Sequence, residues 1–136
     1  MCIRDSPEAA NEVLSSGLDI KLCGLDITRE TSIKREETEW LKGDSPGERL
    51  IRELLDIVFR KLTDRNYFSL HDPIAVLSVL HPELIQWKTS KVSVACDGEN
   101  VGKTNDLDQP NGSVAIGIDI DEDAAKAKIA EILEQH

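Results

Sequence analysis

A histidine and an aspartate stand side by side at His71 and Asp72, directly before Pro73 and the apolar segment 74–80. An imidazole takes up and releases a proton near neutral pH, which suits it to general acid–base catalysis. A carboxylate is a good ligand for a hard cation. Because burying either group without a partner is costly, this pair at the start of an apolar helix indicates a candidate functional site.

The same residues also have a purely structural interpretation. Aspartate is a favoured N-cap residue and proline is pre-shaped for the first helical position, so Asp72 and Pro73 together resemble an ordinary helix start. Under this interpretation the chain is a non-catalytic acidic α/β module in which Asp72 only caps a helix. Both interpretations stay open on these residues alone.

The elements that must position His71 follow from the spacing of apolar residues and from turn residues such as Gly17. Alternation of strands and helices predicts an α/β protein, and residues 64–69 are expected as the loop that delivers His71. The predicted strands cover residues 20–25, 91–96 and 113–118. Ser45 with Pro46 is expected to start the helix whose apolar positions run over 48–62, and Asp121 is expected to cap the last helix. The other predicted helices cover residues 7–16, 31–41 and 74–80.

Helical periodicity also predicts which side chains face inward. Ile33 and Trp40 are the expected inward contacts of the helix over 31–41, and the helix over 74–80 is apolar on every side and is expected to be buried. In the helix over 48–62 the positions with helical spacing are Leu50, Ile51, Leu54, Leu55, Val58 and Leu62.

Composition excludes several classes of protein. The chain has 136 residues, 40% of them hydrophobic, and a net charge of −10, which argues against binding to a nucleic acid polymer. Its lysines and arginines are scattered and its apolar runs are short, which argues against a membrane partner. Cys23 and Cys96 stand singly in apolar surroundings, so we expect reduced, buried cysteines and a cytoplasmic location.

One sequence pattern imitates a nucleotide site. Gly102-Lys103-Thr104 resembles the end of a phosphate-binding loop, but its preceding glycine, Gly98, is one residue too close. The residues that follow are typical of a loop and not of a helix, so we expect no nucleoside triphosphate site there.

Three segments in order carry a resemblance to a known family. The first is residues 6–10 followed by Gly24-Leu25-Asp26-Ile27-Thr28, the second is residues 70–76 followed by residues 81–84, and the third is residues 92–94 followed by 97–98, 102–104 and 111–115. Together they resemble the C-terminal half of the inosine-uridine-preferring nucleoside hydrolases. This resemblance implies the C-terminal portion of a Rossmann-like, mostly parallel sheet flanked by helices.

The resemblance also implies a chemistry. Members of the family use Ca²⁺ to hydrolyse purine or pyrimidine ribonucleosides to ribose and free base. Asp72 corresponds to a Ca²⁺ ligand, and His71 corresponds to a residue beside the leaving base, where an imidazole suits a general acid. The implied partner is a small-molecule ribonucleoside, and the intact enzyme is expected to be a homo-oligomer, either a dimer or a tetramer.

The chain departs from the family in what it lacks. The Asp-x-Asp-Pro-Gly-x-Asp-Asp motif, which binds Ca²⁺ and provides the general base, is absent, as are the Glu and Asn that grip the ribose. The first six residues resemble a translated sequencing adapter. We therefore expect residues 7–136 to be the C-terminal part of one hydrolase domain and to be inactive alone; a genuine short protein is the alternative.

The resemblance leaves the base pocket open. Arg60, Tyr67 and Phe68 lie in the segment from which the family draws its base-contacting residues, but the match there is too loose to assign any of them. The preferred nucleoside also stays undetermined.

Overall fold

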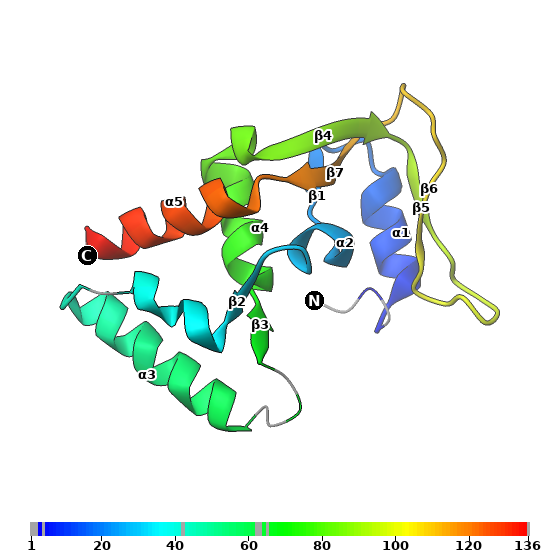
Figure 1. The fold of residues 1–136 in the computed structure, drawn as a ribbon. Helices are drawn as coiled ribbons and strands as arrows, with labels where there is room; N and C mark the ends of the chain where they lie inside the picture. Colours follow the sequence, from blue (N-terminus) through cyan, green and yellow to red (C-terminus); the bar gives the residue numbers. More distant parts are fainter. Residues whose placement is uncertain (1–2, 4, 42, 62–63, 65, 136) are drawn as a thin grey trace. The chain divides into compact units, whose positions relative to one another are not determined.

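The computed structural model of the chain describes residues 3, 5–41, 43–61, 64 and 66–135. It has two compact units, each built from two separate stretches of sequence. The first unit contains residues 1–22 and 87–118, and the second contains residues 23–86 and 119–136. Helices and short strands follow one another along the chain (Figure 1), which confirms the predicted α/β class.

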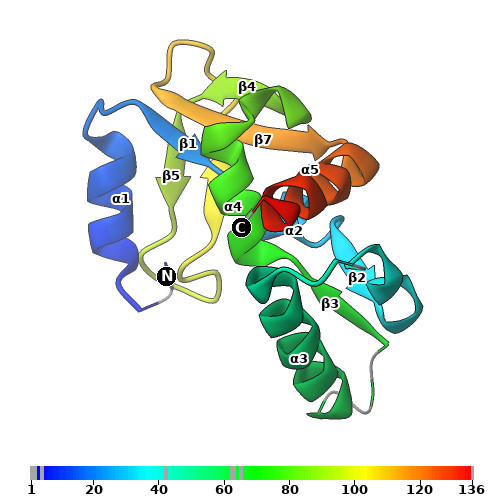
Figure 2. The ribbon, with the colours of Figure 1, turned by 90° about the vertical axis from the view of Figure 1, so that its left-hand side faces the viewer.

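The first unit contains most of the central sheet, whose strand order is β1-β7-β4. Strands β1 (Ile20–Leu22) and β7 (Val114–Ile120) are parallel, with Ile20 opposite Val114. Strand β4 (Ile85–Ser90) runs in the direction opposite to β7 (Figure 2). A separate antiparallel ribbon joins β5 (Val92–Val94) to β6 (Thr104–Asp106).

Helix α1 (Pro7–Ser15) packs against β5 and closes the core of the first unit. The side chain of Asn11 on α1 accepts a hydrogen bond of 2.9 Å from the Val94 N–H. Gly17, with a φ of +79°, follows the helix as predicted, because glycine adopts this left-handed conformation without a steric penalty. The buried core residues are Leu14, Val92, Val94 and Val114.

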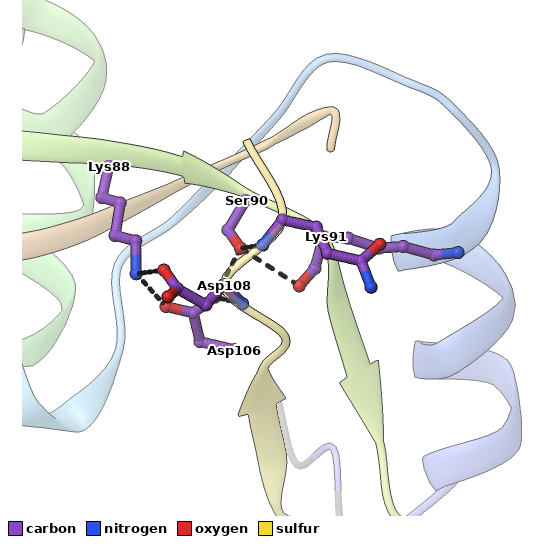
Figure 3. Close-up of polar contacts among 6 residues, drawn as sticks. Lys88, Ser90, Lys91, Asp106 and Asp108 are labelled. Carbon is purple, nitrogen blue, oxygen red and sulfur yellow. Dashed lines mark hydrogen bonds and ion pairs between the residues drawn. The ribbon is translucent and has the colours of Figure 1, made fainter. Parts of the chain in front are cut away.

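A polar network holds the corner between β4 and β6 (Figure 3). The Lys88 ammonium lies 2.8 Å from a carboxylate oxygen of Asp106 and 2.6 Å from one of Asp108. The buried Ser90 hydroxyl contacts Asp106 and accepts a hydrogen bond of 3.1 Å from the Gln109 N–H. The hydrogen bond with Lys88, followed by that with Ser90, lowers the pKa of Asp106 to about 2.

This network predicts an acid-dependent component of stability. Because the pKa of Asp106 is lowered from 3.8 to about 2 on folding, its contribution is complete above about pH 4 and is lost as the pH falls towards 2. Asp106→Asn should therefore lower the urea midpoint near pH 6, and its deficit relative to wild type should shrink below pH 4. Asp97→Asn, at an exposed position, is the control. A deficit that is constant across this range would contradict the assignment.

The second unit is mainly helical and contains a short antiparallel ribbon. Strand β2 (Ser32–Lys34) pairs with β3 (Tyr67–Ser69), with Ser32 opposite Ser69 and Lys34 opposite Tyr67. Helix α4 packs against α2, α5 and η2, and α3 packs against α5. The helices are α2 (Leu25–Thr28), η1 (Arg35–Trp40), α3 (Pro46–Lys61), α4 (His71–Leu80), η2 (Pro82–Leu84) and α5 (Glu122–Glu134).

Three predictions of secondary structure are wrong in whole or in part. The strand expected over 20–25 ends at Leu22, and residues 25–28 form one helical turn that begins after Gly24. The helix expected over 31–41 is instead strand β2 followed by the 3₁₀ helix η1, and the expected loop over 64–69 contains β3. The reason is non-local: β2 and β3 satisfy each other's backbone groups, which outweighs the local helical pattern.

The predicted N-terminal starts of two helices, α3 and α5, are correct. The Ser45 hydroxyl accepts a hydrogen bond of 3.2 Å from the Glu48 N–H at the start of α3, and the Glu48 carboxylate accepts one of 3.3 Å from the Ser45 N–H. This reciprocal pair is a capping box. Asp121 likewise caps α5 by accepting a hydrogen bond of 3.0 Å from the Ala124 N–H.

The predicted burial of apolar side chains is partly wrong. Ile33 is buried as expected, whereas Leu50 and Leu54 on α3 are about half exposed. On α4 one stripe, which includes Ile74 and Leu77, is buried. The prediction that the whole helix is buried is wrong, because Val76, Val79 and Leu80 on its other side are 57%, 69% and 59% exposed. The described residues pack against α4 on one side only. The Trp40 side chain and Leu62 lie outside the described residues.

The two described cysteines are also less buried than predicted. Cys23 is half-buried and Cys96 is exposed in the hairpin that follows β5. Among the described helices, none combines the length and the apolar character that a membrane-spanning helix requires.

Candidate functional site

The backbone around Leu70 fixes where helix α4 begins. The Leu70 N–H donates a hydrogen bond of 3.0 Å to the Thr31 carbonyl, which extends the β2–β3 ribbon by one more contact. The Leu70 carbonyl then accepts the Ile74 N–H at 3.0 Å, the first helical bond of α4. Leu70 and Ile74 are both buried, so the ribbon and the core together place His71 at the first position of the helix.

Asp72 is therefore not the N-cap of α4. The N-cap is Leu70, which makes no side-chain capping bond, and Asp72 is an exposed residue of the first turn. A carboxylate in this turn still interacts favourably with the helix dipole. The prediction that Asp72 caps the helix is wrong, because the hydrogen bond to Thr31 starts the helix earlier than the Asp-Pro pair indicates.

The imidazole of His71 has a specific partner in helix α2. The Thr28 hydroxyl oxygen lies 2.7 Å from Nδ1 of His71, and the Thr28 side chain is buried. Thr28 is the last residue of the turn that begins after Gly24. This role of Thr28 could not be predicted, because no local sequence signal connects two residues that are 43 positions apart.

A pocket of about 390 Å³ opens beside His71. Ser32 and Lys34 on β2 alternate with the buried Ile33, so they share the opposite face of the ribbon with their partners Ser69 and Tyr67. Among the described residues that line it, none is acidic. The pocket is lined by Arg29, Ser32, Lys34, Tyr67, Ser69 and His71.

Arg60, Tyr67 and Phe68, which the sequence could not assign to the base pocket, lie in three different environments. Tyr67 lines the pocket. Arg60 instead forms an ion pair of 2.6 Å with Asp56 on the surface of α3. Phe68 projects from the other face of β3, because side chains alternate along a strand.

The described residues do not form a complete Ca²⁺ site. Ca²⁺ takes six to eight oxygen ligands, and several of them are normally carboxylates. Within the described part of the chain, no group of three or more His, Cys, Asp or Glu side chains is placed to hold a metal ion. Asp72 can supply one ligand group, but the described residues alone do not fit the ion.

Comparison with known proteins shows which family this fold belongs to. The model of the inosine-uridine preferring nucleoside hydrolase family matches residues 3–127. The chain belongs to this family. Its relatives include the pyrimidine-specific ribonucleoside hydrolase RihA of Salmonella newport (strain SL254), which is 31% identical over 125 residues. RihA of Escherichia coli O17:K52:H18 is 30% identical over the same length.

The chain spans 40% of the length of these RihA relatives, and the matched region covers 83% of the chain. Among solved structures, a plant nucleoside hydrolase superposes with a TM-score of 0.80 and 23% identity, covering 98% of this chain and 47% of that one. A purine-preferring ribonucleoside hydrolase from Gardnerella vaginalis gives 0.78 and 20%, covering 96% and 45%. The nucleoside hydrolase fold is therefore shown for this chain, and the family it belongs to consists of N-glycosyl hydrolases.

Thr31 is a second buried threonine near the site, and its hydroxyl differs from that of Thr28 in hydrogen bonding. Thr31, whose carbonyl holds Leu70, is fully buried, and its hydroxyl contacts no polar group among the described residues. A buried hydroxyl without a partner destabilises the folded state, because it has lost its hydrogen bonds to water.

Thr31→Val should therefore stabilise this chain by about 1 kcal/mol, because it replaces the unpaired hydroxyl by a methyl group of similar shape. Urea unfolding of the 136-residue chain measures the change. Thr28→Val is the matched control, since it removes a buried hydroxyl that does have a partner and should destabilise. Destabilisation by Thr31→Val would show that the Thr31 hydroxyl is paired.

Proposed function

We propose that this chain forms the leaving-base side of the active site in a complete enzyme that hydrolyses ribonucleosides to ribose and free base. The observation that supports this most strongly is the placement of His71, which contacts a buried threonine and lines a pocket whose described lining residues carry no carboxylate. Family membership supplies the reaction class. In the second unit His71 lines the pocket, which supports the proposal that its imidazole meets a ligand there.

In this proposal His71 donates a proton to the base as it departs. Cleavage of the bond between the anomeric carbon and the base nitrogen leaves positive charge on the ribose and an electron pair on the base. The proton from the imidazole neutralises that electron pair. Water adds to the anomeric carbon and gives up a proton to a general base that lies outside the described residues. General acid assistance of this kind is typically worth ~10²–10⁴-fold in rate.

The pocket lining suits a base that carries carbonyl oxygens. Arg29 has no ion-pair partner among the described residues, and Lys34 lies 4.0 Å from Glu37. Their positive charge and the hydroxyls of Ser32 and Ser69 can bind carbonyl oxygens, and Tyr67 offers an aromatic surface. These groups are compatible with both pyrimidine bases and oxopurines, so we propose the substrate class as ribonucleosides without a narrower choice.

We further propose that Asp72 contributes one carboxylate ligand to a Ca²⁺ ion in the complete enzyme. Its exposure at the start of α4, without a capping bond, leaves the carboxylate available for this role. The other ligands would come from outside the described residues. A cytoplasmic homo-oligomer, a dimer or a tetramer, remains part of the same proposal. The 136-residue chain alone should hydrolyse no nucleoside.

His71→Ala in a complete enzyme that contains this chain should lower kcat for inosine or uridine by ~10²–10⁴-fold. Nitrophenyl riboside, whose leaving group needs no proton, should be hydrolysed at nearly the wild-type rate. Hydrolysis assays with both substrates measure the ratio, and the 136-residue chain serves as the blank. If His71→Ala slows both substrates equally, His71 is not the acid and its role is packing or stacking.

Asp72→Ala in the same enzyme should abolish turnover and also the increase in Tm that added Ca²⁺ produces, because binding to the folded state stabilises it. His71→Ala is the matched control and should keep the Ca²⁺-dependent shift. Thermal unfolding with Ca²⁺ and with a chelator measures both variants. An unchanged Ca²⁺ shift in Asp72→Ala would mean that Asp72 is not a ligand.

A further inference from the structure

We propose that Thr28 is the positioning residue of His71: its hydroxyl engages Nδ1 and leaves Nε2 as the nitrogen that meets the base. The catalytic meaning of this assignment rests on the proposed function, but the contact itself does not. Within the described residues Nδ1 is the ring nitrogen of His71 that has a polar partner, at 2.7 Å from the Thr28 hydroxyl oxygen. The ring also lines the pocket.

Thr28 is itself held in place by the backbone and the packing of α2. Its N–H donates a hydrogen bond of 3.1 Å to the Gly24 carbonyl, and the preceding Ile27 is 2% exposed. Thr28 itself is 3% exposed. Helix α2 packs directly on α4, so Thr28 cannot move away from His71 without opening the core of the second unit.

A hydroxyl suits this position because it can both donate and accept a hydrogen bond. When both ring nitrogens carry a proton, Nδ1–H donates to the Thr28 oxygen and Nε2–H points to the base. Transfer of the Nε2 proton to the base nitrogen leaves a neutral ring with its proton on Nδ1, still bonded to Thr28. The heavy atoms therefore need not rearrange during proton transfer. The hydrogen bond to Thr28 holds the imidazole ring in one productive orientation throughout the step.

The contact is tested on the 136-residue chain by ¹⁵N spectra of the imidazole rings at one fixed pH. Wild type and Thr28→Ser, which keeps the hydroxyl, should show ring shifts for His71 that differ from those of a free imidazole. Thr28→Val should return them to the free pattern. His81, whose Nδ1 lies 3.0 Å from a carboxylate oxygen of Glu83, is the internal control and should not change.

Two results would overturn the assignment: a free-imidazole pattern for His71 in wild type or in folded Thr28→Ser, or an unchanged pattern in folded Thr28→Val. The wild-type and serine spectra decide the question even if the valine variant does not fold. In a complete enzyme Thr28→Val should lower kcat for natural nucleosides about tenfold and spare nitrophenyl riboside, with serine restoring the rate. Loss on both substrates would indicate a structural role only.

These outcomes separate the inference from the proposed function. If His71→Ala leaves turnover of natural nucleosides intact while Thr28→Val still changes the His71 ring shifts, the contact exists and the catalytic proposal fails. If His71→Ala lowers turnover and the ring shifts do not respond to Thr28, the imidazole is catalytic and another group positions it.

Discussion

The hydrogen bond from the Leu70 N–H to the Thr31 carbonyl is the contact on which the site depends. It adds one more backbone bond to the β2–β3 ribbon and turns the chain directly into α4, so that the residue after Leu70 begins the helix. The side chains of Leu70 and Ile74 anchor that turn in the core. His71 then reaches both the pocket and Thr28. If the helix started at Asp72, the side chains of His71 and Asp72 would point in other directions.

The pocket is chemically unlike the rest of the chain. The sequence carries a net charge of −10, yet the pocket lining contains two cationic side chains, two serines, a tyrosine and a histidine. Such a lining suits a ligand that gains negative charge as its bond breaks. The carboxylates that a metal ion requires are not grouped in the described residues. The lack of such a group agrees with the proposal that this chain, which spans 40% of the length of its curated relatives, forms one side of a larger site.

The parts of the structure that could be predicted from the sequence are those with local causes. Gly17 ends α1, Ser45 and Asp121 begin α3 and α5, and the late strands lie close to where alternation placed them. The ribbon that carries the pocket could not be predicted, because residues 32–34 and 67–69 become strands only by pairing with each other. The predicted burial of Val79 failed because periodicity shows which side chains are apolar and not what covers them.

The candidate site was predicted in the same uneven way. Adjacent residue types and the family resemblance identified His71 and Asp72, but Thr28 and Arg29 entered only through the fold. A threonine at the end of one helical turn has no sequence signal that ties it to a histidine 43 residues later. Its role depends on α2 packing against α4, which is a tertiary contact.

The central claim, that Thr28 and His71 act as one unit, is tested most directly by a double-mutant cycle on this chain. Thr28→Val, His71→Phe and the double variant are unfolded in urea, and the coupling free energy is taken from the three differences. The account predicts a coupling of about 1 kcal/mol between these positions and additivity between Thr31→Val and His71→Phe. A coupling of zero between Thr28 and His71 would contradict it.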